Sequence, residues 1–276
     1  MDKRILTVQD ISCVGQCSLT VALPVLSAFG IETAVLPTAV LSNHTYGYSG
    51  WTFADLTDEM PKINERWNTE NVDFDVIYTG YLGSARQIDY IKTLFAERIR
   101  ECGIAIVDPV MADNGKLYSG FDLDFVSRMA GLVSVSDIIL PNITEACFLT
   151  GVEYVEGCQN KEYIQTLIEK LVGIGAKKVV LTGVSFSPEE LGVAVYDGEK
   201  IEYRFEGYIN KKFHGTGDLF ASAFTGAYAQ GDSLADAAQF AARVVIQAIK
   251  HTISDDSHWY GVKFEKALPM ITARNK

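Results

Sequence analysis

The stretch "DVIYTGYLGSARQIDYIKTLFAERIRECGIAIVDP" at residues 75–109 joins two short apolar runs through one long segment of helical spacing. The runs at 75–80 and 104–109 are continuously apolar, which is typical of parallel strands covered on both faces. Within 84–103 the apolar residues recur at helical spacing, and we expect Ser84 to cap this helix and Gly103 to end it. The stretch therefore predicts a strand–helix–strand unit.

The same alternation continues along most of the chain and predicts an α/β fold with a mostly parallel sheet. Further strand-like runs and a second helical pattern stand at 5–10, 33–37, 137–142, 178–183 and 160–176. Residues 192–206 read as a hairpin around "DGEK", which we expect to lie antiparallel at the sheet edge. After it come two long apolar helices, the first bounded by Gly231 and the second capped by Ser233. No linker or repeat interrupts the pattern, so one domain is expected.

Composition narrows the function classes. The chain has 276 residues, 48% of them hydrophobic, and a formal net charge of −11. No run of Lys or Arg exceeds two residues, which argues against nucleic-acid and membrane partners. The first apolar segment is too short for a signal peptide or a membrane span. Five scattered cysteines without a CxxC pair fit reduced thiols, so we expect a cytoplasmic protein.

The segment "HGTGD" at 214–218 indicates where chemistry takes place. Gly215 and Gly217 permit close backbone approach, and the helix that follows directs free N–H groups and its positive dipole end at the loop. This suits a phosphoryl group, although the segment matches neither the Walker loop nor the dinucleotide fingerprint. Asp218 has two interpretations: a charge favoured at a helix start, or a general base that takes a proton from an attacking hydroxyl.

Carboxylates after the predicted strands suggest a magnesium environment. Asp108, Asp113 and Glu145 could hold Mg²⁺ largely through water, as this ion prefers. Asn142 and Glu145 have NxxE spacing, which is equally the pattern of a helix capping box. Thr182, in the "VVLTG" run, offers a further phosphate contact.

Taken together, these motifs resemble those of the ribokinase-like superfamily and, more narrowly, of pyridoxal kinases. Five segments stand in the order and spacing of that family: "LSNHTYGYSGW" (41–51), "YTGYLGSARQ" (78–87), "VDPVMAD" (107–113), "LPNITEACFLTG" (140–151) and "HGTGDLFAS" (214–222). The similarity covers roughly residues 4–255, and "SNHT" and "TGYLGS" are its most specific parts.

The resemblance implies a fold and an activity. The fold is a three-layer α/β/α sandwich, formed by one ribokinase-like kinase domain over residues 1–276, with a mostly parallel central sheet and antiparallel edge strands. The activity is ATP-dependent phosphorylation of the 5′-hydroxymethyl group of pyridoxal, pyridoxine or pyridoxamine, with Mg²⁺ required and a homodimer expected. The need for a monovalent cation stays open, because Leu140 stands where the family often has threonine.

The resemblance also assigns roles to residues of this chain. The catalytic group comprises the base and the anion hole: Asp218, Gly215, Thr216 and Gly217. ATP contacts fall on Asn142, Thr182, Gly183 and Gly217. The metal environment falls on Asp108, Asp113 and Glu145. Around the substrate the resemblance places Asp10 or Ser12 against the ring, together with His44, Thr45, Tyr81, Asp218 and the lid residue Tyr118.

Two alternatives remain beside this hypothesis. The first is a kinase of the same fold that acts on hydroxymethylpyrimidine, which is also a flat heteroaromatic ring with a hydroxymethyl arm. The second is a protein that binds the vitamer or the nucleotide without catalysis. An intact GTGD segment argues against the second, because binding alone needs no base beside the phosphate hole.

Overall fold

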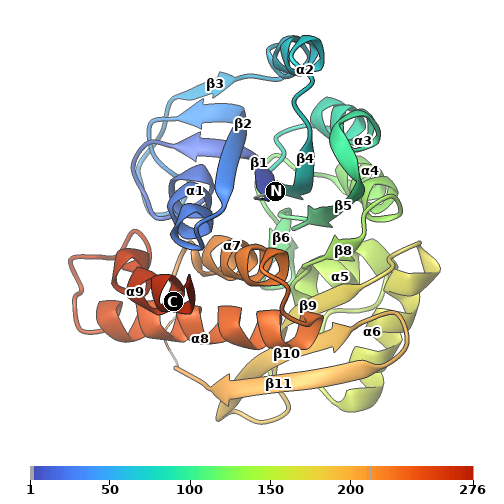
Figure 1. Ribbon diagram of the computed structural model, residues 1–276. Coiled ribbons are helices and arrows are strands. Elements are labelled where there is room, and N and C mark those ends of the chain that lie inside the picture. Colours follow the sequence, from blue (N-terminus) through green and yellow to red (C-terminus); the bar gives the residue numbers. More distant parts are fainter. Residues whose placement is uncertain (1–2, 210, 212, 276) are drawn as a thin grey trace.

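Nine strands form one central sheet in the computed structural model, which describes residues 3–209, 211 and 213–275 (Figure 1). Their order is β11-β10-β9-β8-β5-β4-β1-β2-β3. The bounds are β1 Arg4–Ser12, β2 Glu32–Leu41, β3 Phe53–Asp55, β4 Phe74–Thr79, β5 Ile99–Val107, β8 Ile138–Ile139, β9 Val179–Val184, β10 Glu190–Tyr196 and β11 Ile201–Gly207. Strands β2, β1, β4, β5, β8 and β9 run parallel, while β3, β10 and β11 are antiparallel to their neighbours.

Helices cover both faces of this sheet, as expected from continuously apolar strands. The helices are α1 Leu19–Ala28, α2 Met60–Thr69, α3 Ala85–Arg98, α4 Leu123–Val133, α5 Ile143–Thr150, α6 Lys161–Gly173, α7 Thr216–Ala229, α8 Leu234–Thr252 and α9 Leu268–Thr272, with 3₁₀ turns η1 Phe264–Lys266 and η2 Ala273–Asn275. Helices α1, α7, α8 and α9 share one apolar core with the sheet, and α2 to α6 share the other. This is the three-layer ribokinase-like sandwich that the sequence predicted.

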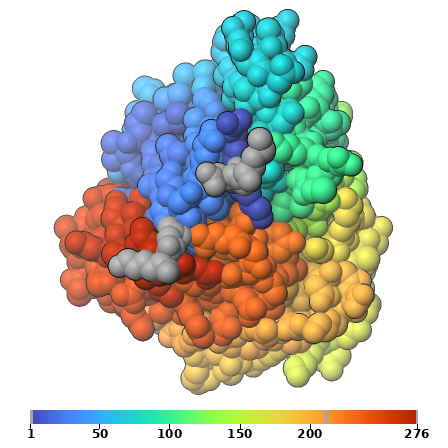
Figure 2. All heavy atoms as spheres, in the orientation of Figure 1, coloured from blue at the N-terminus to red at the C-terminus, as the bar shows by residue number. Residues whose placement is uncertain are grey.

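The first and last helices of the described chain lie side by side. Helix α9 packs against α1, so the red C-terminal region adjoins the blue N-terminal region in the space-filling view (Figure 2). No helix in the described part of the chain is long and apolar enough to span a membrane.

The local predictions mostly hold, with one error. Ser84 caps α3 by accepting the N–H of Gln87, Ser233 caps α8, and β10 and β11 pair as the edge hairpin. The prediction that Gly103 ends a helix is wrong, because α3 stops at Arg98 and residues 99–103 begin β5. A Cβ at Gly103 would stand 2.9 Å from the carbonyl oxygen of Asp75, so this glycine lets two strands approach closely.

The sheet order gathers the polar strand ends. In a parallel sheet the carboxyl ends of the strands share one edge, where ligands bind in open α/β folds. Asp10 and Ser12 end β1, Asp108 follows β5, and Asn142 follows β8. The loop that leads into α7 reaches the same edge, because Gly215 packs on the carbonyl of Gln16 just after β1. The candidate site therefore stands at the middle of the sheet.

Candidate functional site

The start of α7 offers a backbone anion hole. Gly215 caps the helix with a φ of +73°, and a Cβ there would stand 1.6 Å from the carbonyl oxygen of Gln16, so only glycine fits. A Cβ at Gly217 would meet nothing within 4 Å, so the space over this turn is open. Thr216 lies between them and donates its hydroxyl to the carbonyl of Phe213. The first N–H groups of α7 are thus available to an anion that approaches through the open side.

Asp218 lies in the first turn of α7 and is half-buried. Burial raises the pKa of its carboxyl to about 6, and the negative charge of Asp10 raises it further, while a hydrogen bond from the backbone N–H of Ser18 opposes both. A carboxylate with a pKa near neutrality is a far better proton acceptor than an ordinary aspartate. A carboxyl that can accept a proton therefore stands in the same helical turn as N–H groups that can hold an anion.

Asp10 and Ser12 were expected as alternative contacts to the substrate ring, but they lie together as a hydrogen-bonded pair. Both are buried, and the Ser12 hydroxyl donates to Oδ2 of Asp10 at 2.9 Å. Burial raises the pKa of Asp10, against the hydrogen bonds from Ser18 and Ser12. Any ring that contacts one of these residues would therefore meet a hydrogen-bonded pair.

The loop after β2 carries His44 and Thr45, with unequal consequences. The backbone N–H of Tyr46 donates to Nδ1 of His44, so Nε2 carries the proton and donates to the carbonyl of Tyr260 at 2.9 Å. Both ring nitrogens are thus engaged within the protein, and His44 can offer a ligand only its ring face or edge. Thr45 is exposed on the same loop.

Two tyrosines border different parts of the site. Tyr81 is half-buried, and burial raises the pKa of its hydroxyl, with the charges of Asp10 and Asp55 adding to the effect. Tyr118 is 42% exposed, yet burial of its hydroxyl raises the pKa of that group, followed by the charges of Glu145 and Asp113. Tyr81 therefore lies near Asp10, and Tyr118 lies near Glu145 and Asp113.

The NxxE pair forms a complete capping box at the start of α5. Oδ1 of Asn142 accepts the N–H of Glu145, and Oε2 of Glu145 accepts the N–H of Asn142, both at 2.9 Å. Glu145 Oε1 also accepts the N–H of Met111, and the Asn142 amide donates to the carbonyl of Ala112. The structural interpretation of NxxE is thus confirmed, and the same pair holds the 111–112 segment in place.

Buried carboxyl groups cluster beside this box. Burial raises the pKa of Glu145 to about 8, while backbone hydrogen bonds oppose it. Burial also raises the pKa of Asp108 well above its usual range, and the charges of Glu145 and Asp218 add to it. Asp113 is exposed and accepts hydrogen bonds from Asn114. A cation would relieve this repulsion.

The carboxylates of the site suit a Mg²⁺ ion that keeps several water ligands, rather than an ion enclosed by protein ligands alone. Within the described residues, no three His, Cys, Asp or Glu side chains stand close enough to ligate one ion directly. Mg²⁺ usually keeps several waters and takes one or two carboxylates plus substrate phosphates. Asp108 and Glu145 suit that mode, with Asp113 at the edge.

A cavity of about 390 Å³ opens beside the end of β9. Thr182 directly precedes Gly183, which lines the cavity, and forms a parallel bridge with Asn142. The cavity is lined by Gly157, Cys158, Gly183, Ser185, Pro188, Glu190, Leu191 and Tyr208. The volume falls within the usual range for small-molecule sites.

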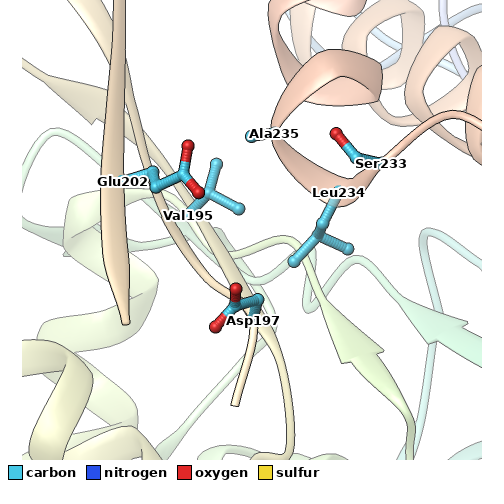
Figure 3. A pocket seen from close by; sticks show the side chains of 6 residues that line it. All are labelled: Val195, Asp197, Glu202, Ser233, Leu234 and Ala235. Carbon is cyan, nitrogen blue, oxygen red and sulfur yellow. The ribbon is translucent and has the colours of Figure 1, made fainter. Parts of the chain in front are cut away.

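A second hollow, of about 70 Å³, lies between the β10–β11 hairpin and the start of α8 (Figure 3). Asp197 and Glu202 line it on the hairpin, and Ser233 and Leu234 on the helix side. Helix α7 starts at the candidate site and ends shortly before α8 begins, so this hollow lies at the opposite end of α7 from Asp218. It plays no part in the site.

Comparison with known proteins decides the family. The sequence profile described as phosphomethylpyrimidine kinase matches residues 22–262. The chain belongs to the phosphomethylpyrimidine kinase family. Hydroxymethylpyrimidine/phosphomethylpyrimidine kinase of Bacillus subtilis is 30% identical over 233 residues, covering 83% of this chain and 81% of that protein. The fold and the resemblance to kinases of the ribokinase-like superfamily are thereby confirmed.

Solved structures extend the comparison to pyridoxal. Pyridoxal kinase from Lactobacillus plantarum is 33% identical with a TM-score of 0.91, covering 99% of this chain and 98% of that chain. A proposed phosphomethylpyrimidine kinase from Bacteroides thetaiotaomicron, in a crystal form with pyridoxal, is 38% identical with a TM-score of 0.91, covering 98% and 96%. Kinases named for pyridoxal and for pyrimidine substrates thus both resemble this chain, and the family alone leaves the acceptor open.

Sequence reasoning missed several residues that shape the site. The N–H of Ser18 reaches Asp218, and His214 stacks against His44 and Tyr46 in the loop after β2. Ser18 precedes an apolar helical run, so its place at a helix start was readable. The stacking of His214 on His44 could not be read from the sequence, because the two residues are 170 positions apart and no local pattern links them.

Proposed function

We propose that this protein catalyses ATP-dependent phosphorylation of the 5′-hydroxymethyl group of pyridoxal, pyridoxine or pyridoxamine. The observation that carries the proposal is the position of Asp218, a carboxyl with a pKa of about 6 in the first turn of α7, beside the open anion hole of Gly215 to Gly217. A binding protein needs no proton acceptor there. A kinase needs a proton acceptor and a charge-stabilising donor set within reach of one another.

In this mechanism the residues of the chain have separate tasks. Asp218 accepts the proton of the substrate hydroxyl as its oxygen attacks the γ-phosphorus. The N–H groups at the start of α7 stabilise the transferred phosphoryl group. Bound Mg²⁺ would neutralise charge on the triphosphate, with Asp108, Asp113 and Glu145 holding it largely through water. The hairpin of β6 (Ala112–Asp113) and β7 (Lys116–Leu117), which leads to Tyr118, would close over the ligands and exclude water.

The two ligands are assigned to opposite sides of Asp218. Asn142, Thr182, Gly183 and the 390 Å³ cavity are proposed to receive ATP, because this cavity opens at the carboxyl end of β9, where ligands bind in open α/β folds. Asp10 and Ser12 are proposed to contact the ring, with His44, Thr45 and Tyr81 around it. The need for a monovalent cation stays open, since Leu140 is buried and offers no side-chain oxygen.

The deciding experiment measures ADP release with ATP, Mg²⁺ and one candidate acceptor at a time. Release that depends on pyridoxal, pyridoxine or pyridoxamine supports the proposal. Release that depends only on hydroxymethylpyrimidine supports the second candidate function, which the 30% identity to the Bacillus subtilis enzyme favours. Release with neither acceptor, despite measurable ATP binding, would leave the binding-protein alternative.

Setting and assembly complete the proposal. All five cysteines lie in the described residues without a disulfide, which fits a reducing compartment such as the cytoplasm. A homodimer is proposed from the family resemblance, and light scattering of the purified protein tests it.

A further inference from the structure

Four segments far apart in the sequence meet beside the anion hole. A Cβ at Gly15 would stand 2.1 Å from Cδ2 of His44, and a Cβ at Gly261 would stand 2.3 Å from Cβ of Gln16. Gln16 in turn contacts Gly215 of the anion hole. These close approaches join four segments: the loop after β1, the loop after β2, the GTGD turn and a segment near the C-terminus.

The C-terminal segment contacts the loop of residues 44–48, here called the substrate loop. The ring of Trp259 lies 4.9 Å from that of Tyr48, and a Cβ at Gly47 would stand 2.7 Å from Cζ3 of Trp259. The neighbouring carbonyl of Tyr260 accepts the hydrogen bond from His44. One side of the substrate loop thus rests on residues 259–260.

The substrate loop also touches the residue before the anion hole. The ring of His214 lies 3.6 Å from that of Tyr46 and 5.8 Å from that of His44, centroid to centroid. The loop therefore contacts both Trp259 and His214, and His214 is followed directly in the chain by Gly215.

Trp259 stands on a base that local contacts make rigid. Asp255 accepts the N–H and the hydroxyl of Ser257 and pairs with the ammonium of Lys263. The N–H of Lys263 donates to Thr252 at the end of α8. Both ends of the segment that carries Trp259 are thus tied to α8, although nothing in the proposed reaction uses this segment.

We propose that Trp259 is a positioning residue for the acceptor alcohol. It fixes the substrate loop beside Asp218, so that the hydroxymethyl compound is held in line with the phosphoryl group, while ATP binds on the other side of α7. This inference rests on the proposed function, because it names what the loop positions. Trp259 itself touches no reacting atom.

The kinetic test compares two tryptophans of equal exposure. Trp259 is 48% exposed and Trp51 is 49% exposed, and the latter stacks on no other ring within the described residues. In W259A the KM for the acceptor should rise about three- to tenfold, the value of one lost aromatic contact, with the KM for ATP unchanged. W51A should leave both constants unchanged, and W259F should recover part of the loss.

Coupling and proteolysis separate positioning from a general loss of fold. If Trp259 acts through Tyr48, the double variant W259A/Y48A should be no worse for the acceptor than the more impaired single variant. Chymotrypsin should cleave after Tyr46 or Tyr48 faster in W259A than in the wild type or W51A, with equal melting temperatures.

Either of two kinetic results overturns the inference: an unchanged acceptor KM in W259A, or an equal rise in W51A. If the wild type transfers phosphate to none of pyridoxal, pyridoxine and pyridoxamine, the proposed function fails. The proteolysis rates then still decide whether Trp259 holds the loop, and equal rates in W259A and the wild type refute it.

Discussion

Replacing Asp218 with asparagine should depress turnover and stabilise the fold at the same time. The side chain keeps its shape and can still accept the N–H of Ser18, but it can no longer take a proton. Loss of a general base lowers kcat by roughly 10²- to 10⁴-fold, and the dissociation constant for ATP should stay near its wild-type value.

The stability gain follows from the pKa. Burial raises the pKa of Asp218 from 3.8 to about 6, so the unfolded chain loses this proton at lower pH than the folded protein does. The stability of the wild type therefore falls as pH rises from about 4 to about 6 and stays lower above that range. The gap of about two pKa units corresponds to roughly 3 kcal/mol, which solvent at this half-buried group reduces to roughly 1–2 kcal/mol.

The assay is denaturant unfolding of D218N and the wild type at pH 4 and pH 8, alongside single-turnover kinetics. The variant should be more stable at pH 8 and nearly equal at pH 4. Equal differences at both pH values would refute the raised pKa, and a kcat within tenfold of the wild type would refute the role of the base. Wild-type turnover itself should fall as pH drops below about 6, because the base is then protonated.

Two further changes address the anion hole and the carboxylates. In G215A the free energy of unfolding should fall by roughly 1–3 kcal/mol or more, because the added Cβ meets the Gln16 carbonyl at a left-handed φ. G217A should keep the stability of the wild type and lose turnover. Circular dichroism with kinetics separates the two, and equal stabilities would contradict the packing described. Binding of Mg²⁺ and ATP at pH 7 should release a proton from Glu145, whose pKa burial raises to about 8, and E145Q should reduce that release to the part that comes from Asp108, whose pKa is also raised by burial. Calorimetry in buffers of different ionisation enthalpy measures it, and a release unchanged in E145Q would exclude Glu145 as its source.

The sequence predicted the layers because strand burial and helix periodicity are local signals. The edge hairpin and the caps of α3 and α8 followed from turn and capping residues in the same way. The end of α3 was mispredicted at Gly103, because a glycine that permits close strand approach looks the same in sequence as one that ends a helix.

For the site, the motifs identified polar strand ends that the fold gathers at one edge of the sheet, but not how their side chains are bonded. NxxE proved to be a full capping box, and both nitrogens of His44 proved to be internally bonded. The role of Trp259 left no trace in the sequence, since its partners lie more than 200 residues away. Such contacts depend on the return of the C-terminus to the N-terminal face, which no local pattern encodes.

The strand order has a consequence for how such a protein can change its acceptor. Strands β1 to β3 and their loops lie on one flank of the sheet, and β8 to β11, with the larger cavity, lie on the other. Under the proposed function, most residues placed around the alcohol lie in the first sixty residues, and one short C-terminal segment supports their loop. Tyr81, Tyr118 and the residues assigned to the nucleotide come between these two pieces. Acceptor choice could then drift, or be engineered, by exchanging these two terminal pieces together, whereas exchange of the first piece alone would leave its loop without the indole that supports it.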